Sequence, residues 1–237
     1  MAEPKGSRSR RLLRAVGAAP ATPGTISFPL RGYHMFAYCK NCPVMFADAS
    51  GGGSITDIAG KRKEQQDRAN KDFSPINGQS TCEYADVAFG KKKMRDNGCA
   101  ILALYNAQGL TGQATYVPNL IAYFERKGRI RLFGVFPWEI DDYLSEVHVA
   151  HRRAKTMKEM NALLAKGGVA VVTFWNSTIK GSFVPDVFRG AHTVALAHDG
   201  NGTYSIYNAY NNRSTPLCCG SIEEYIGKGY YYGFYIG

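Results

Sequence analysis

Residues 96–105 read Asp-Asn-Gly-Cys-Ala-Ile-Leu-Ala-Leu-Tyr. Small and polar residues typical of loops and helix starts lead into an almost wholly apolar run, which Gly109 ends. The pattern predicts a buried helix with Cys99 in its first turn. Backbone N–H groups in a first turn have no partner within the helix, and the helix dipole favours an anion there. We therefore expect the thiolate of Cys99 to form easily.

Further helices are predicted after this one. Pro118 suits the first position of a helix that Gly128 stops, and Pro137 opens the next. Thr156 and Glu159 have the spacing of a capping box, which predicts the start of another helix.

From residue 169 onward the pattern changes to strands. Residues 169–175 are β-branched and apolar on both sides, which is typical of a central strand. Residues 192–198 and 203–210 flank the turn sequence Asp-Gly-Asn-Gly and predict a hairpin.

The chain closes with a short helix and a strand. Ser221 and Glu224 form a second capping box, and residues 230–236 are a run of aromatic and β-branched residues. Helices come first and antiparallel strands follow, so we predict an α+β fold in which a helical lobe precedes a sheet lobe.

Two polar residues of the predicted hairpin can act on the thiol. His192 begins a strand after a loop that contains glycine, and Asn208 lies on the next strand. The side-chain carbonyl of Asn208 would accept a hydrogen bond from one imidazole nitrogen and turn the other toward the sulfur of Cys99. Each residue alone is ordinary, but Cys, His and Asn in this order are typical of a thiol nucleophile with its base.

The sequence resembles the papain-like cysteine peptidase superfamily, most closely its small bacterial C39-like peptidase-like proteins. The resemblance is carried by three segments, residues 97–107, 191–200 and 204–212. It covers residues 81–237. It implies a papain-like fold in which the helical lobe carries Cys99, the sheet lobe carries His192 and Asn208, and the substrate binds between them.

One position departs from the family pattern. Papain-like enzymes have a glutamine about six residues before the cysteine, which completes the oxyanion hole, and Lys93 stands there instead. The nearest upstream glutamine is Gln79. We expect Asn97, or the Cys99 backbone N–H with a second donor, to stabilise the oxyanion.

These features predict a thiol hydrolase of peptide or amide bonds that acts through a thioester. Two alternatives stay open. The same triad would serve an acyl or amide-group transferase, and the loss of the glutamine favours a non-catalytic binding module that keeps the scaffold.

The charge distribution and the motifs of the sequence restrict which partners, cofactors and metals we expect. The net charge is +10, but the basic runs contain no interleaved aromatic residues, so we expect a peptide or amide substrate and no nucleic-acid partner. P-loop, dinucleotide and zinc-protease motifs are absent from the sequence, and we expect no cofactor. Six cysteines include one Cys-x-x-Cys pair, Cys39 and Cys42, which is too few for a usual zinc site, so we expect no metal.

The sequence suggests three regions. Residues 1–26 are predicted to be a disordered basic tail, residues 27–80 a peripheral arm, and residues 81–237 the catalytic domain. No apolar run is long enough to span a bilayer, and the basic opening lacks the apolar core of a signal peptide. We therefore expect a cytoplasmic protein, with its oligomeric state open.

Overall fold

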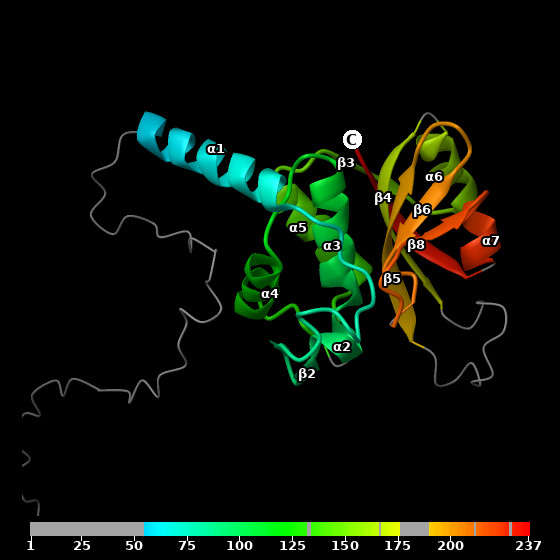
Figure 1. Cartoon of the computed structure of the whole chain (residues 1–237), viewed down its shortest axis with the longest axis horizontal. Coiled ribbons are helices and arrows are strands. Elements are labelled where there is room, and N and C mark those ends of the chain that lie inside the picture. Colours follow the sequence, from blue (N-terminus) through cyan, green and yellow to red (C-terminus); the bar gives the residue numbers. More distant parts are fainter. Residues whose placement is uncertain (1–54, 132–133, 166, 176–189, 211, 228) are drawn as a thin grey trace, which may run out of the picture. The chain divides into compact units, whose positions relative to one another are not determined.

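A six-stranded antiparallel sheet is the central element of the structure (Figure 1). The computed structural model describes residues 55–131, 134–165, 167–175, 190–210, 212–227 and 229–237. The strands, in their order across the sheet, are β3 (His151–Ala154), β8 (Tyr230–Ile236), β4 (Gly168–Trp175), β5 (Ala191–His198), β6 (Tyr204–Tyr207) and β7 (Leu217–Cys219). Every neighbouring pair is antiparallel.

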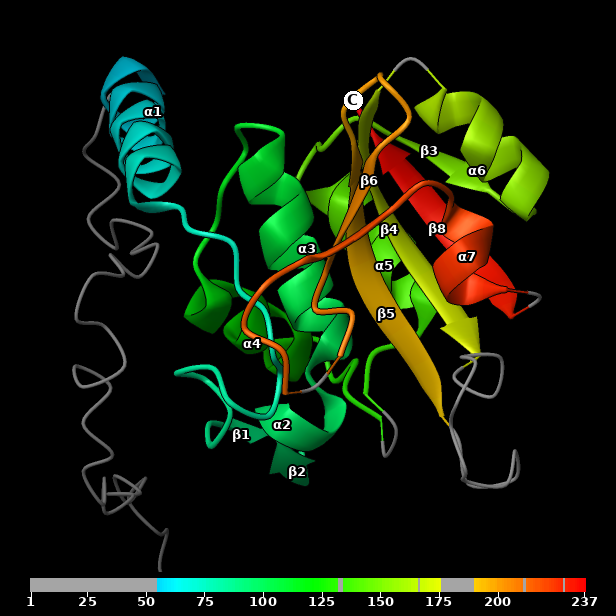
Figure 2. The same ribbon diagram turned by 45° about the vertical axis from the view of Figure 1, so that its right-hand side comes forward.

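Helices cover both faces of this sheet, as Figures 1 and 2 show. On one face lie α3 (Cys99–Leu110), α4 (Val117–Arg126) and α5 (Pro137–Glu146), and on the other α6 (Met157–Leu164) and α7 (Ile222–Ile226). The elements before α3 are α1 (Ile55–Asp72), the short hairpin of β1 (Ala88–Phe89) and β2 (Lys92–Lys93), and α2 (Met94–Asn97). Among the described residues, no helix is both long and apolar enough to span a membrane.

Strand β4 is buried on both faces. Val169 and Val171 belong to the core under α3, whereas Ala170 and Val172 belong to the core under α6 and α7. Successive side chains of a strand point to opposite faces, so a strand covered on both sides needs a continuous apolar run. The prediction of a central strand over residues 169–175 is confirmed, because β4 lies between β8 and β5.

The mixed helical and antiparallel architecture confirms the α+β prediction. The Thr156 hydroxyl accepts a hydrogen bond from the Glu159 backbone N–H at 3.2 Å, as the capping box predicts. The predicted return strand over residues 203–210 is too long, because β6 ends at Tyr207. Asn208 follows it with φ of +58°, a left-handed conformation that a strand does not accommodate. Strands β3 and β7 were not predicted.

Helix α1 and the segment after it are hydrogen-bonded to α3 and to the residues that follow α3. Asn106 of α3 holds both backbone groups of Ile76 through its carboxamide, each at 2.8 Å. The Gln66 side chain donates to the Ala114 carbonyl at 2.7 Å, and the Ala114 N–H donates to the Asn70 side chain at 2.8 Å. These bonds cross the predicted boundary at residue 81, which stays a prediction.

Other regional predictions fall outside the described residues. The predicted tail, residues 1–26, lies there, as do Cys39 and Cys42.

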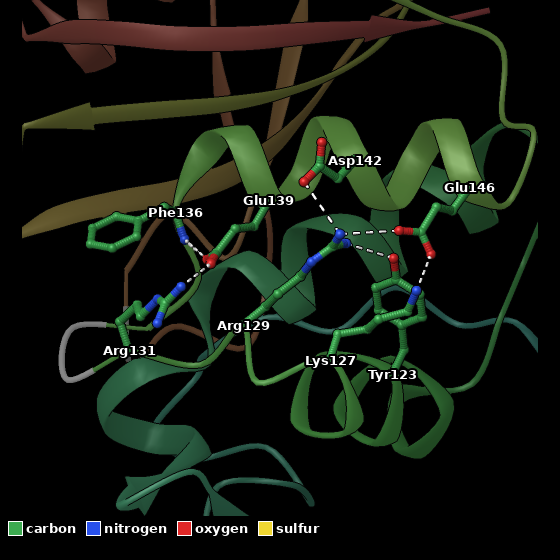
Figure 3. Close-up of polar contacts among 8 residues, drawn as sticks. All are labelled: Tyr123, Lys127, Arg129, Arg131, Phe136, Glu139, Asp142 and Glu146. Carbon is green, nitrogen blue, oxygen red and sulfur yellow. Dashed lines mark hydrogen bonds and ion pairs between the residues drawn. The ribbon is translucent and has the colours of Figure 1, made fainter.

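An ion-pair cluster joins α4 to α5 (Figure 3). Glu146 accepts hydrogen bonds from Lys127 at 2.9 Å and from Arg129 at 3.0 Å, and Arg129 also donates to the Tyr123 hydroxyl at 2.7 Å. The hydrogen bonds from Lys127 and Tyr123 lower the pKa of Glu146 to about 2.

We expect Glu146→Gln to be less stable than the wild type at neutral pH and to match it in strong acid. The folded pKa of Glu146 lies below its unfolded value, so its contribution is complete above the unfolded pKa and is lost as the pH falls through about 2. Urea denaturation midpoints of both proteins, measured at about pH 7 and about pH 2, test this. A difference that stays the same at both pH values would contradict it.

Candidate active site

Cys99 is the first residue of α3 and directly follows α2. Gly98 joins the two helices, and a Cβ atom there would lie 2.6 Å from the carbonyl oxygen of Met94, so this junction requires glycine. The Cys99 side chain is partly buried. The thiol therefore lies at the N-terminal end of a buried helix, as predicted.

The loop before α5 packs against the end of α2. Gly134 has φ of +99°, and a Cβ atom on it would lie 2.8 Å from the Asn97 carbonyl oxygen. Glu139, whose side chain is 4% exposed, accepts from the Phe136 N–H at 2.9 Å and pairs with Arg131 at 3.4 Å (Figure 3). These contacts fix the loop beside the residues that precede Cys99.

His192 is the second residue of β5 and is buried. It lies opposite Phe174 of β4, and the two rings meet edge to face with centroids 5.8 Å apart. The pairing of β5 with β6 begins only at Ala195, so His192 lies beyond the end of that ladder.

The side chains of Cys99 and His192 are hydrogen-bonded to each other. Burial alone would raise the pKa of the Cys99 thiol, but the hydrogen bond and the charge of His192 outweigh it and lower that pKa. Burial alone would lower the pKa of His192, and the contact with Cys99 outweighs it and raises that pKa. Both shifts favour a thiolate beside an imidazolium, which is the nucleophilic form of such a pair.

The second nitrogen of His192 binds Asn208, but not through the predicted oxygen. Nε2 of His192 donates to the backbone carbonyl of Asn208 at 2.8 Å. A carbonyl can only accept, so Nε2 carries a proton and Nδ1 is the nitrogen left to bond Cys99. The prediction that the side-chain carbonyl of Asn208 orients the ring is wrong.

The side chain of Asn208 is instead paired with Gln79. The Gln79 backbone N–H donates to Asn208 Oδ1 at 3.0 Å, and Asn208 Nδ2 donates to Gln79 Oε1 at 3.3 Å. The Asn208 backbone N–H donates to Asn77 Oδ1 at 2.9 Å. The backbone of Asn208 is left-handed, with φ of +58°, a conformation that asparagine tolerates better than most residues.

Gln79 is a site residue whose position the sequence analysis did not predict. Its Nε2 donates to the carbonyls of Met94 and Arg95 at 3.0 and 3.1 Å, so it presents no spare donor to an oxyanion. The only signal in the sequence was that Gln79 is the nearest glutamine upstream of Cys99.

Thr193 is a second residue that the sequence analysis missed. Its backbone N–H and its hydroxyl both hydrogen-bond to the sulfur of Cys99 and lower the pKa of that thiol. The Thr193 hydroxyl is also 3.0 Å from that of Thr173, its partner across β4 and β5. Both threonines are buried, so the pair satisfies polar groups that would otherwise be costly to bury.

The remaining predicted positions are partly described. Asn97 is buried, two residues before Cys99, and its role at an oxyanion stays a prediction. Lys93, where the family has its glutamine, is exposed and pairs with Asp86 at 2.8 Å. Within the described part of the chain, no group of three His, Cys, Asp or Glu side chains could hold a metal ion.

We expect Thr193→Val to raise the pKa of Cys99, measured from iodoacetamide rates across pH, by about one unit, which corresponds to the loss of one hydrogen bond to a charged group. Valine keeps the shape and the backbone N–H but removes the hydroxyl, so the pKa of Cys99 should rise. Thr193→Ser keeps the hydroxyl and serves as the matched control. Equal pKa values of Cys99 in the valine and serine variants would show that the hydroxyl does not act on the sulfur.

Comparisons with known proteins found a distant likeness among solved structures. No family model matches the chain, and no curated protein matches it. Among solved structures, it is similar to the peptidase domain of ComA from Streptococcus, a bi-functional ABC transporter involved in a quorum sensing pathway. The two share 15% sequence identity with a TM-score of 0.42, over 63% of this chain and 96% of that domain. A likeness of this size assigns no activity, so the functional conclusion depends on the geometry of the site.

Proposed function

We propose that this chain is a papain-like thiol hydrolase that cleaves peptide or amide bonds. One observation carries the proposal: the Cys99 thiol, at the first position of a helix, is hydrogen-bonded to a buried imidazole. The pKa of the thiol is lowered and that of the imidazole is raised. Shifts of this kind, in opposite directions on two partners, are the usual mark of a nucleophile and its base.

In the first half of the reaction, His192 takes the proton of Cys99. The thiolate attacks the carbonyl carbon of the substrate, and the carbonyl electrons move to oxygen to give a tetrahedral oxyanion. When this intermediate collapses, the carbon–nitrogen bond breaks and the imidazolium of His192 gives its proton to the departing amine. The product on the enzyme is a thioester of Cys99.

In the second half, His192 acts as a base again. It removes a proton from water, the hydroxide adds to the thioester carbonyl, and the carbon–sulfur bond breaks. The acid leaves, and Cys99 returns to its starting state. An amine in place of water would give acyl transfer with the same residues.

The oxyanion needs donors from the start of α3. The backbone N–H of Cys99 belongs to the helix end whose N–H groups lack intrahelical partners. We assign the second donor to the side chain of Asn97, which is buried two residues away.

Two other cysteines, Cys82 and Cys219, should not compete with Cys99 as nucleophiles. Burial raises the pKa of Cys82 and of Cys219, which keeps both as unreactive thiols at neutral pH.

Incubation with a mixture of fluorogenic peptide amides should release the fluorescent amine and leave an acyl adduct on Cys99. Intact-mass spectrometry after an acid quench detects the adduct, and peptide mapping locates it. Cys99→Ala should release no amine, and His192→Ala should form no adduct at neutral pH. Added glycinamide separates hydrolysis from transfer, because a transferase would form the amide product. A wild-type protein that binds these peptides without amine release or adduct would identify a binding module.

Asn97→Leu tests the oxyanion assignment. Leucine is close to asparagine in size and is uncharged, but it has no N–H₂ donor, so kcat for the same peptide amides should fall about 100-fold. The rate of Cys99 alkylation should stay unchanged, because the variant adds no charge beside the thiol. An unchanged kcat would remove Asn97 from the oxyanion site.

A further inference from the structure

Asn208 has two carbonyl oxygens, one in the backbone and one in the side chain, and they accept hydrogen bonds from different residues. The backbone oxygen accepts from Nε2 of His192, and the side-chain oxygen accepts from the backbone N–H of Gln79. The backbone of Asn208 is left-handed at this position, with φ of +58°. Such a conformation is unfavourable for most residues, whereas glycine adopts it freely.

Gln79 connects this turn to the start of the nucleophile's helix. Its Oε1 and backbone N–H bond the carboxamide of Asn208, and its Nε2 bonds the carbonyls of Met94 and Arg95 in α2. The amide group of Gln79 cannot flip without losing all of its side-chain bonds, because donor and acceptor would exchange places. Gln79 is 3% exposed and Asn208 fully buried, so water does not compete for these groups.

We propose that Asn208 orients His192 through its backbone carbonyl, and that Gln79 is a positioning residue that holds the left-handed turn in place. The proposal rests on the proposed function, since it concerns the same thiol and imidazole. Gln79 acts on His192 indirectly. It fixes the position of the Asn208 backbone carbonyl, which accepts the hydrogen bond of His192, relative to the helix that begins at Cys99.

The proposal ranks two variants that both lack the carboxamide. Asn208→Gly keeps the backbone carbonyl and adopts a positive φ without strain, so the pKa of Cys99, measured from iodoacetamide rates across pH, should lie nearer the wild-type value than that of Asn208→Ala. Asn208→Ala disfavours the left-handed turn, so its alkylation rate at neutral pH should be about tenfold below that of Asn208→Gly. If the side chain were the orienting group, both variants would lose reactivity equally.

Gln79→Ala adds the second half of the test. It should slow the alkylation of Cys99 severalfold when residue 208 is asparagine. In the Asn208→Gly background its effect should be smaller, because glycine adopts the left-handed turn without a side-chain partner. Gln66→Ala is the matched control, because it removes a side-chain bond to the Ala114 carbonyl and should leave the pKa of Cys99 unchanged. Circular dichroism confirms that each variant is folded before its rates are compared.

A direct measurement complements the variants. Proton NMR of nitrogen-15-labelled protein should show a slowly exchanging Nε2–H resonance of His192 in both the wild type and Asn208→Gly. Loss of that resonance in Asn208→Gly, equal rates for the glycine and alanine variants, or equal effects of Gln79→Ala in both backgrounds would each overturn the proposal. An ordinary pKa for Cys99 in the wild type would instead reject the proposed function itself.

Discussion

The hydrogen bond between Cys99 and His192 depends on a meeting of two elements that are far apart in the sequence. The first residue of α3 lies against the beginning of β5, and both elements are anchored by the core beneath them. That core includes Leu102 and Leu104 of α3, both fully buried, and each such side chain contributes about 1.5–3 kcal/mol. Apolar burial of this kind offsets the cost of holding a thiol and an imidazole away from water.

The polar groups around the pair are satisfied in a connected chain. It runs from the carbonyls before Cys99 through Gln79 and Asn208 to His192. Thr193 and Thr173 supply a second support, on the sulfur side. Buried networks that are fully bonded are rigid, whereas a single missing partner is costly. The site therefore obtains its geometry from hydrogen bonds at the start of β5 and its stability from the apolar layers below.

The sequence was sufficient for features that depend on local pattern. Glycine and an apolar run predict that α3 begins at Cys99, and a β-branched run buried on both faces predicts β4. The sequence was not sufficient to predict features that arise where distant parts of the chain meet. The left-handed turn at Asn208 ends β6 early, and the Asn208 side chain is hydrogen-bonded to Gln79, which lies in a segment predicted to be peripheral. Thr193 looked like one more buried strand residue, since its contact with Cys99 follows from the packing of α3 on β5.

The protonation state of Cys99 tests this account most directly. The ultraviolet absorbance of thiolate can be titrated in the wild type and in Cys99→Ser, so that their difference isolates this one thiol. We predict a transition well below the ordinary thiol pKa of about 8.5, and a return toward that value when His192→Gln removes the imidazole. A transition at or above the ordinary value in the wild type, unchanged by His192→Gln, would contradict the account.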